Sequence, residues 1–266
     1  MRLFGHSHLT MASAVLLLSA AIVYAGSRSG AVGEPLAVAA ARPAAAVPLK
    51  DAKLNIEHNA TDEDTGFQGF VDSEGWKRLD VRTPGGDRVL TFEARGTLGK
   101  LGLTELFFES VEPENKDVPI DEMLANLPEG NYTIAGPSQE NGKSVGSTSG
   151  TALLTHDIPA GPVLVSPAEG ATVPVRGVVA RWKPVSKTIT GEPVKIIAYQ
   201  LIIEKDVEPH RHMIGKLGLS IYVPRSVTSI AVPNGFLEAR TKYNWEVLAI
   251  ERSGNQTLSS GSFRTK

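Results

Sequence analysis

The residues of this sequence best suited to chemistry are the carboxylates of an acidic stretch, TDEDTGFQGFVD, at Asp62, Asp64 and Asp72. Oxygen ligands at alternate positions are typical of the start of a calcium-binding loop. The helix-loop-helix calcium pattern needs glycine at the sixth position from Asp62, but Phe67 stands there and the glycine is Gly66. Two interpretations stay open. The stretch is either a calcium site at one end of a sandwich or, as we favour, a solvated acidic turn.

Two glycine-rich segments have the composition of catalytic loops without their spacing. GPSQENGKS places five residues between Gly136 and Gly142, whereas a phosphate-binding loop has four and leads into a helix N-terminus. GSTSG puts Thr148 where a nucleophile elbow has serine, and no alternation of strands and helices surrounds it. We predict a hairpin tip for the first segment and ordinary loop residues for the second.

The remaining candidates for metal chemistry are His210 and His212, which share a direction if their segment is extended. Two imidazoles are too few to hold zinc or copper, and the chain has no cysteine to add to them. We expect exposed loop histidines. No acid, base and nucleophile stand at a catalytic spacing, so the sequence predicts neither an enzyme nor a cofactor.

Length and charge limit the partner and the number of domains. The chain has 266 residues, enough for two domains, with 27 Lys and Arg against 29 Asp and Glu and no basic block. That balance argues against nucleic acid as a partner.

The N-terminal segment has the layout of a secretory signal peptide. Arg2 precedes an apolar run from Met11 to Tyr24, with Val23 and Ala25 before the expected cleavage point. The run is shorter than the about 20 residues that cross a bilayer, so we expect residues 1–25 to be removed and no stable membrane span to remain. The absence of cysteine means that no disulfide supports the exported chain, which suits a bacterial periplasm or surface.

The elements that must position any site are strands. Residues 26–50 are mostly Ala, Gly, Pro, Ser and Val, which predicts a flexible linker. Beyond it, short runs rich in Val, Ile, Leu, Thr and aromatics alternate with Gly, Pro, Asn and Asp, which predicts an all-β protein. We expect two β-sandwich domains in tandem, 51–158 and 161–266, separated by the prolines of HDIPAGPVLVSP, with a tight hairpin at PGGD and one short helix in PIDEMLANLPEG.

The second domain resembles the fibronectin type III family. The resemblance rests on Trp182-x-Pro184, on Ile197-x-Tyr199-x-Leu201, on Leu237 six positions before Tyr243, and on Tyr243-x-Trp245-x-Val247. It implies a sandwich of seven strands whose core includes Trp182, Tyr199, Leu237, Tyr243 and Val247, with the tyrosine hydroxyl bonded to backbone near the preceding turn. The loop at 206–218 is longer than usual, and the Arg-Gly-Asp tripeptide of integrin binding is absent.

The first domain resembles bacterial immunoglobulin-like modules through LPEGNYTIAG and the strand that follows, and the whole chain resembles exported bacterial proteins that join such a module to a fibronectin type III domain. The signal peptide and the missing catalytic set lead us to expect a secreted or periplasmic, non-enzymatic protein whose modules bind a protein or glycan at the cell envelope or act as spacers. The alternative is a carbohydrate-binding module protein or an accessory to an extracellular hydrolase, for which Trp76 is the one candidate aromatic platform, although we favour a core role for this residue.

Overall fold

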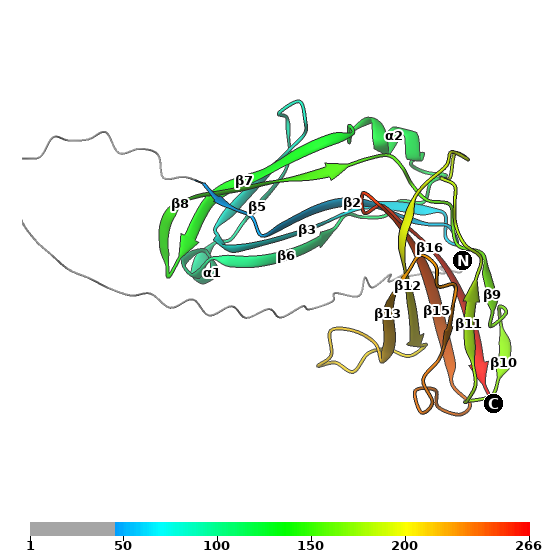
Figure 1. The fold of residues 1–266 in the computed structure, drawn as a ribbon. Helices are drawn as coiled ribbons and strands as arrows, with labels where there is room; N and C mark the ends of the chain where they lie inside the picture. The colour runs from blue at the N-terminus through cyan, green and yellow to red at the C-terminus, as the bar shows by residue number, and fades with distance from the viewer. Residues whose placement is uncertain (1–45) are drawn as a thin grey trace, which may run out of the picture.

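The computed structural model describes residues 46–266 and shows a protein built almost entirely of strands. The predicted signal peptide and residues 26–45 of the predicted linker lie outside the described residues. The prediction of an all-β protein with two sandwiches in tandem is confirmed, and in Figure 1 the second sandwich extends downward from one end of the first.

Strands β1 to β8 and both helices belong to the first sandwich. Their bounds are β1 Val47–Pro48, β2 Asp51–Asn59, β3 Asp64–Trp76, β4 Arg78–Arg82, β5 Arg88–Glu93, α1 Gly96–Leu101, β6 Leu103–Glu109, α2 Ile120–Ala125, β7 Gly130–Glu140 and β8 Lys143–Leu154. Strands β6, β3 and β2 form one layer, and β5, β4, β7, β8 and β1 form the other. Alternate residues of both layers meet in a core that includes Ile56, Trp76, Tyr132 and Leu154.

The second sandwich holds strands β9 to β16. Their bounds are β9 Leu164–Ser166, β10 Ala171–Val173, β11 Val179–Trp182, β12 Ile196–Lys205, β13 Gly218–Pro224, β14 Ser229–Ala231, β15 Lys242–Glu251 and β16 Gln256–Thr265. A three-stranded sheet, β14-β11-β9, packs against β16-β15-β12-β13, and β10 pairs with the end of β16. This three-against-four arrangement is a fibronectin type III-like sandwich.

The aromatic residues of the second domain lie where the resemblance implies. Trp182, Tyr199, Leu237, Tyr243 and Val247 are all buried in one core. The backbone N–H of Glu238 donates to the Tyr243 hydroxyl at 2.8 Å, which forms the tyrosine corner. The first domain has a similar contact, because the Tyr132 hydroxyl donates to the carbonyl of Pro128 at 3.0 Å.

Removing the Tyr243 hydroxyl is expected to lower stability moderately. Tyr243→Phe keeps the buried ring but leaves the Glu238 N–H without its acceptor, which costs about 1 to 2 kcal/mol. Denaturant melts measure this cost. Tyr222→Phe is the matched control, since 55% of Tyr222 is exposed; an equal loss in both variants would contradict the corner.

Strand β3 does not stand out as an apolar run in the sequence, because polar residues and glycine interrupt it. Gly69 is required there, since a Cβ on it would lie 2.4 Å from the Phe108 ring that fills the space beside it. Helix α1 and strand β10 were also not predicted. The linker was predicted to reach residue 50, but Val47 and Pro48 pair in parallel with β8, so the ordered strands begin earlier.

The two sandwiches are joined by a parallel pairing between β2 and β16, in which Glu57 lies opposite Gln256 and Asn59 opposite Leu258. Within the 13-stranded sheet, a run of seven strands therefore continues through both domains in the order β6-β3-β2-β16-β15-β12-β13, and we call this run the seven-stranded sheet. Each half of this sheet covers its own core with one face, which leaves the opposite face continuous from one domain to the other.

Candidate functional site

The structure does not bring the three aspartates of the acidic stretch together. Asp62 Oδ2 accepts from Asn59 Nδ2 at 2.9 Å within the turn after β2. Asp64 begins β3 and bridges to Glu114, whereas Asp72 lies between Asp51 and Glu105. Eight residues of strand separate Asp64 from Asp72, which is about 27 Å. A single calcium ion cannot contact both ends of that strand.

The other motifs occupy positions that offer no converging chemistry. GPSQENGKS forms the hairpin between β7 and β8. His210 and His212 lie in the exposed loop before β13, with ring centroids 5.4 Å apart and Arg211 Nε donating to His212 Nε2.

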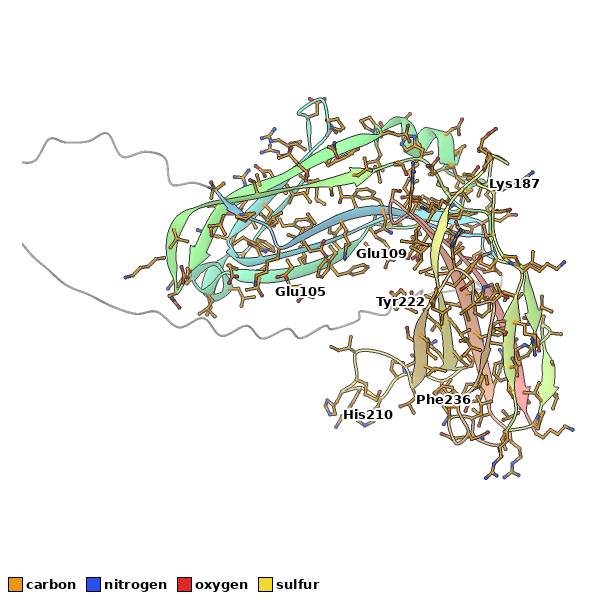
Figure 2. All side chains as sticks on the ribbon, viewed as in Figure 1. Glu105, Glu109, Lys187, His210, Tyr222 and Phe236 are labelled. Carbon is orange, nitrogen blue, oxygen red and sulfur yellow. The ribbon has the colours of Figure 1, made fainter. Side chains whose placement is uncertain are left out.

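Carboxylates do converge on the outer face of the seven-stranded sheet, at the junction of the domains. Residues that alternate with the core residues form this face, which we call the junction face. From the first domain it includes Asn55, Glu57, Gln68, Phe70, Phe107 and Glu109, and from the second it includes Gln200, Ile202, Glu204, Ser220, Tyr222, Glu246, Leu248, Gln256 and Leu258. Figure 2 shows Glu109 and Tyr222 on the two sides of the angle between the domains.

Two of these acidic side chains form a cluster beside β2 with a third carboxylate, Glu112, from the loop after β6. Carboxylate oxygens of Glu57, Glu109 and Glu112 all lie within 4.8 Å of one another. Glu112 reaches the cluster because Gly66 has no side chain, and a Cβ there would lie 2.6 Å from Glu112 Cγ. Glu57 comes from β2 and Glu109 from the end of β6, and the glutamines beside the cluster come from β3 and β16.

Two glutamines hold the cluster in place. Gln68 Nε2 donates to Glu109 Oε1 at 2.7 Å, and Gln68 Oε1 accepts from Gln256 Nε2 at 3.1 Å. Gln256 Nε2 also donates to Glu57 Oε2. Three carboxylates could contribute to a hard cation site, but calcium takes about six to eight oxygens and the amides already occupy some of the acceptor positions.

Burial and mutual repulsion raise the pKa of several acids on the junction face. Burial, together with the charges of Glu112 and Glu109, raises the pKa of Glu57 to about 8, although the hydrogen bond from Gln256 opposes the shift. Burial, Glu204 and Asp62 raise the pKa of Glu246 to about 7 against the influence of Lys216. These side chains therefore take up or release protons near neutral pH.

Glu57→Gln is expected to flatten the dependence of stability on pH. Because the pKa of Glu57 is raised from 4.5 to about 8 on folding, the folded protein binds more protons than the unfolded chain in that window. Stability therefore falls as pH rises from about 4.5 to about 8. One pKa unit is about 1.4 kcal/mol, so we expect the variant to be at least about 2 kcal/mol more stable than the parent at high pH.

Denaturant melts of Glu57→Gln and of the parent at about pH 5 and about pH 8.5 measure this effect. Glu140→Gln, at an exposed position on β7, is the control. If the parent and both variants lost the same stability as pH rises, the assignment of this pH dependence to Glu57 would be wrong.

Sequence reasoning missed this site although a signal for it exists. Glu57 alternates with Leu54 and Ile56 in a predicted strand, and Glu204 alternates with Leu201 and Ile203, so an outward acidic face is visible in each strand separately. The pairing of β2 with β16 joins segments 199 residues apart, as in the hydrogen bond from Ile56 to Asn255. No local pattern predicts that pairing.

Comparisons with known proteins leave the chain without an assigned family. No protein-family model matches the chain, and no curated protein matches it either. A segment of two fibronectin type III domains from chicken tenascin is 12% identical, covers 82% of this chain and 99% of its own, and has a TM-score of 0.30. Domains FN1–FN3 of chicken CNTN1 are 11% identical to this chain, with a TM-score of 0.31. The match covers 83% of this chain and 65% of that chain.

A tetra-tandem repeat from the extending region of a large adhesion protein is 16% identical, with 81% of this chain and 50% of that chain covered and a TM-score of 0.29. At these scores the likenesses carry no weight for the fold or the function. The description of the fold depends on the strand order and the buried side chains of this chain.

Proposed function

We propose that this chain is a non-enzymatic, exported binding or spacer protein that holds two β-sandwiches at a fixed angle and presents the junction face to a partner at the cell envelope. The observation that carries this proposal is the seven-stranded sheet that runs through both domains. Two domains connected only by a linker would move independently, whereas a shared sheet fixes their relative orientation.

Hydrogen bonds around the junction support a fixed orientation. Asn255 Oδ1 accepts from the Ile56 N–H at 2.8 Å, and Asn255 Nδ2 donates to the Thr155 carbonyl at 2.8 Å. Thr257 Oγ1 donates to the Pro159 carbonyl at 2.6 Å. These contacts satisfy polar groups at the interface. They connect the start of β16 to β2 and to the segment that follows β8.

The layout of residues 1–25 supports export, and a secreted or periplasmic location is part of the proposal. Helices long and apolar enough to cross a membrane are absent from residues 46–266. N-terminal sequencing of exported protein tests this part; the proposal expects a start near Gly26, and an intact Met1 in the membrane fraction would contradict it.

The carbohydrate-binding alternative needs an exposed tryptophan, and the described residues contain none. Trp76 is fully buried in the first core, and Trp182 and Trp245 are buried in the second. The large exposed aromatics among the described residues are Phe107 and Tyr222, both on the junction face. A single ring in each domain is a poor stacking surface for a glycan, so we place a protein segment first among possible partners.

Spin labels can test the fixed angle, because the chain has no cysteine and introduced cysteines are labelled uniquely. Lys143→Cys at the exposed end of β8 and Arg176→Cys in the second domain form a suitable pair. The proposal expects one narrow distribution of distances between the labels. A broad distribution in the parent background would contradict it.

A further inference from the structure

We infer that the junction face binds an extended segment of a partner protein that carries lysine or arginine side chains. This inference rests on the proposed function, since it names the chemistry of the partner that the face would receive. The acidic side chains of the face, its aromatic side chains and its extent across both domains favour such a segment.

The junction face carries acidic side chains without ion-pair partners, and these side chains become negative as they ionise near and above neutral pH. Within the described part of the chain, Glu57, Glu109, Glu204 and Glu246 form no salt bridge. Some acids elsewhere do have such a partner, as Lys242 Nζ with Asp206 at 2.8 Å illustrates. A cationic partner would pair with these acids once they are ionised.

The acids are distributed in a way that suits a segment rather than a single ion. Glu57 and Glu109 lie on the first domain, whereas Glu246 and Glu204 lie on β15 and β12 of the second. Gln256 lies beside Glu57 and Ser260 beside Glu246, four residues apart along β16. That separation is about 13 Å along the strand, which equals the distance between alternate outward side chains i and i+4 of an extended peptide.

Aromatic side chains on the same face favour lysine and arginine over other cations. Lys53 Nζ lies 5.6 Å from the centroid of the Phe70 ring, so this face already holds one ammonium group over an aromatic ring. Tyr222 is 55% exposed on the edge strand β13. Burial and, to a smaller extent, the charge of Glu57 raise the pKa of the Tyr222 hydroxyl, which indicates that the two side chains lie within one electrostatic environment.

Protonation of the acids provides a distinctive signature of this mode of binding. Glu57 faces Glu112, Glu109 and Tyr222, and its pKa is raised to about 8. Glu246 faces Glu204, Asp62 and Lys216, and its pKa is raised to about 7. Lysine in the partner keeps its charge over this range, so binding should strengthen as pH rises and these acids ionise.

Fluorescence anisotropy with a labelled synthetic peptide of alternating lysine and threonine tests the inference on the full chain. We expect binding to tighten about tenfold between about pH 6 and about pH 8.5, which is the factor for one pKa unit. The combined variant Glu57→Gln and Glu246→Gln should weaken binding about tenfold and remove the pH dependence. Glu140→Gln, far from the face, should change neither, and a peptide with glutamine for each lysine should not bind.

Three results would overturn the inference. The first is equal weakening by Glu140→Gln, which would indicate attraction to overall charge. The second is weakening of peptide binding by the combined variant to the same extent at all pH values. The third is stoichiometric binding of calcium alone through Glu57 and Glu109, with no competition by the peptide. If the peptide fails to bind while the spin-label distances stay narrow, the partner chemistry is wrong and the proposed function stands.

Discussion

Trp182→Ala is expected to lower the free energy of unfolding by about 3 to 5 kcal/mol. The indole is 3% exposed and belongs to the core between the two sheets of the second sandwich. Its ring lies 5.5 Å from that of Tyr199 in an edge-to-face arrangement. The Trp182 Nε1 has no hydrogen-bond partner among the described residues, so the cost comes from the cavity and not from a lost hydrogen bond.

Denaturant melts of Trp182→Ala, Trp182→Phe and Leu153→Ala show whether the loss of stability comes from the buried indole or from truncation of any apolar side chain. Trp182→Phe retains most of the apolar volume and should lie between the parent and alanine. Leu153 is 49% exposed on β8, so its truncation should cost little. A cost below about 1 kcal/mol for Trp182→Ala would mean that the indole does not fill the space between the sheets.

The second sandwich was predictable from sequence because its strands alternate cleanly. Tyr243, Trp245 and Val247 face the core while the residues between them face outward, and tyrosine and tryptophan at this spacing are specific enough to suggest the family of folds. The first sandwich was less predictable. Its longest strand, β3, contains Gly66, Gly69 and Gly75, which remove the alternation that identifies a strand.

The candidate site was not predictable, because it depends on pairing between distant segments. Three aspartates close in sequence suggested a metal site, yet an extended strand separates Asp64 from Asp72. Glu57 and Glu246, which are far apart in sequence, share one face because β2 and β16 pair. Proximity along an extended chain is a poor guide to proximity in space when each residue adds about 3.3 Å.

The boundary between the domains, predicted near Pro159 to Pro162, leads to a separate expectation. A fragment of residues 161–266 contains the whole of the second core and is expected to unfold cooperatively. It should be less stable than the same domain in the full chain, since the edge of β16 that pairs with β2 becomes exposed. A fragment that stays unfolded would show that the domains depend on each other for folding.

Asn255→Ala is expected to cost about 2 to 4 kcal/mol and to uncouple the two domains. The Asn255 side chain is 1% exposed and joins the Ile56 N–H to the Thr155 carbonyl. Alanine leaves both groups buried without partners, and each unpaired group costs about 1 to 3 kcal/mol. Because these contacts connect β16 to the first domain, their loss weakens the shared sheet more than either core.

Calorimetry and spin-label distances on the same variant distinguish uncoupling from simple destabilisation. We expect the single unfolding transition of the parent to separate into two, and the distances between labels at Lys143→Cys and Arg176→Cys to broaden. Thr61→Ala is the matched control, since it removes only one exposed contact of the junction, the hydrogen bond from the Ser260 N–H to Thr61 Oγ1. If Asn255→Ala lowers stability in one sharp transition with unchanged distances, Asn255 is a residue of local packing and the fixed angle has another cause.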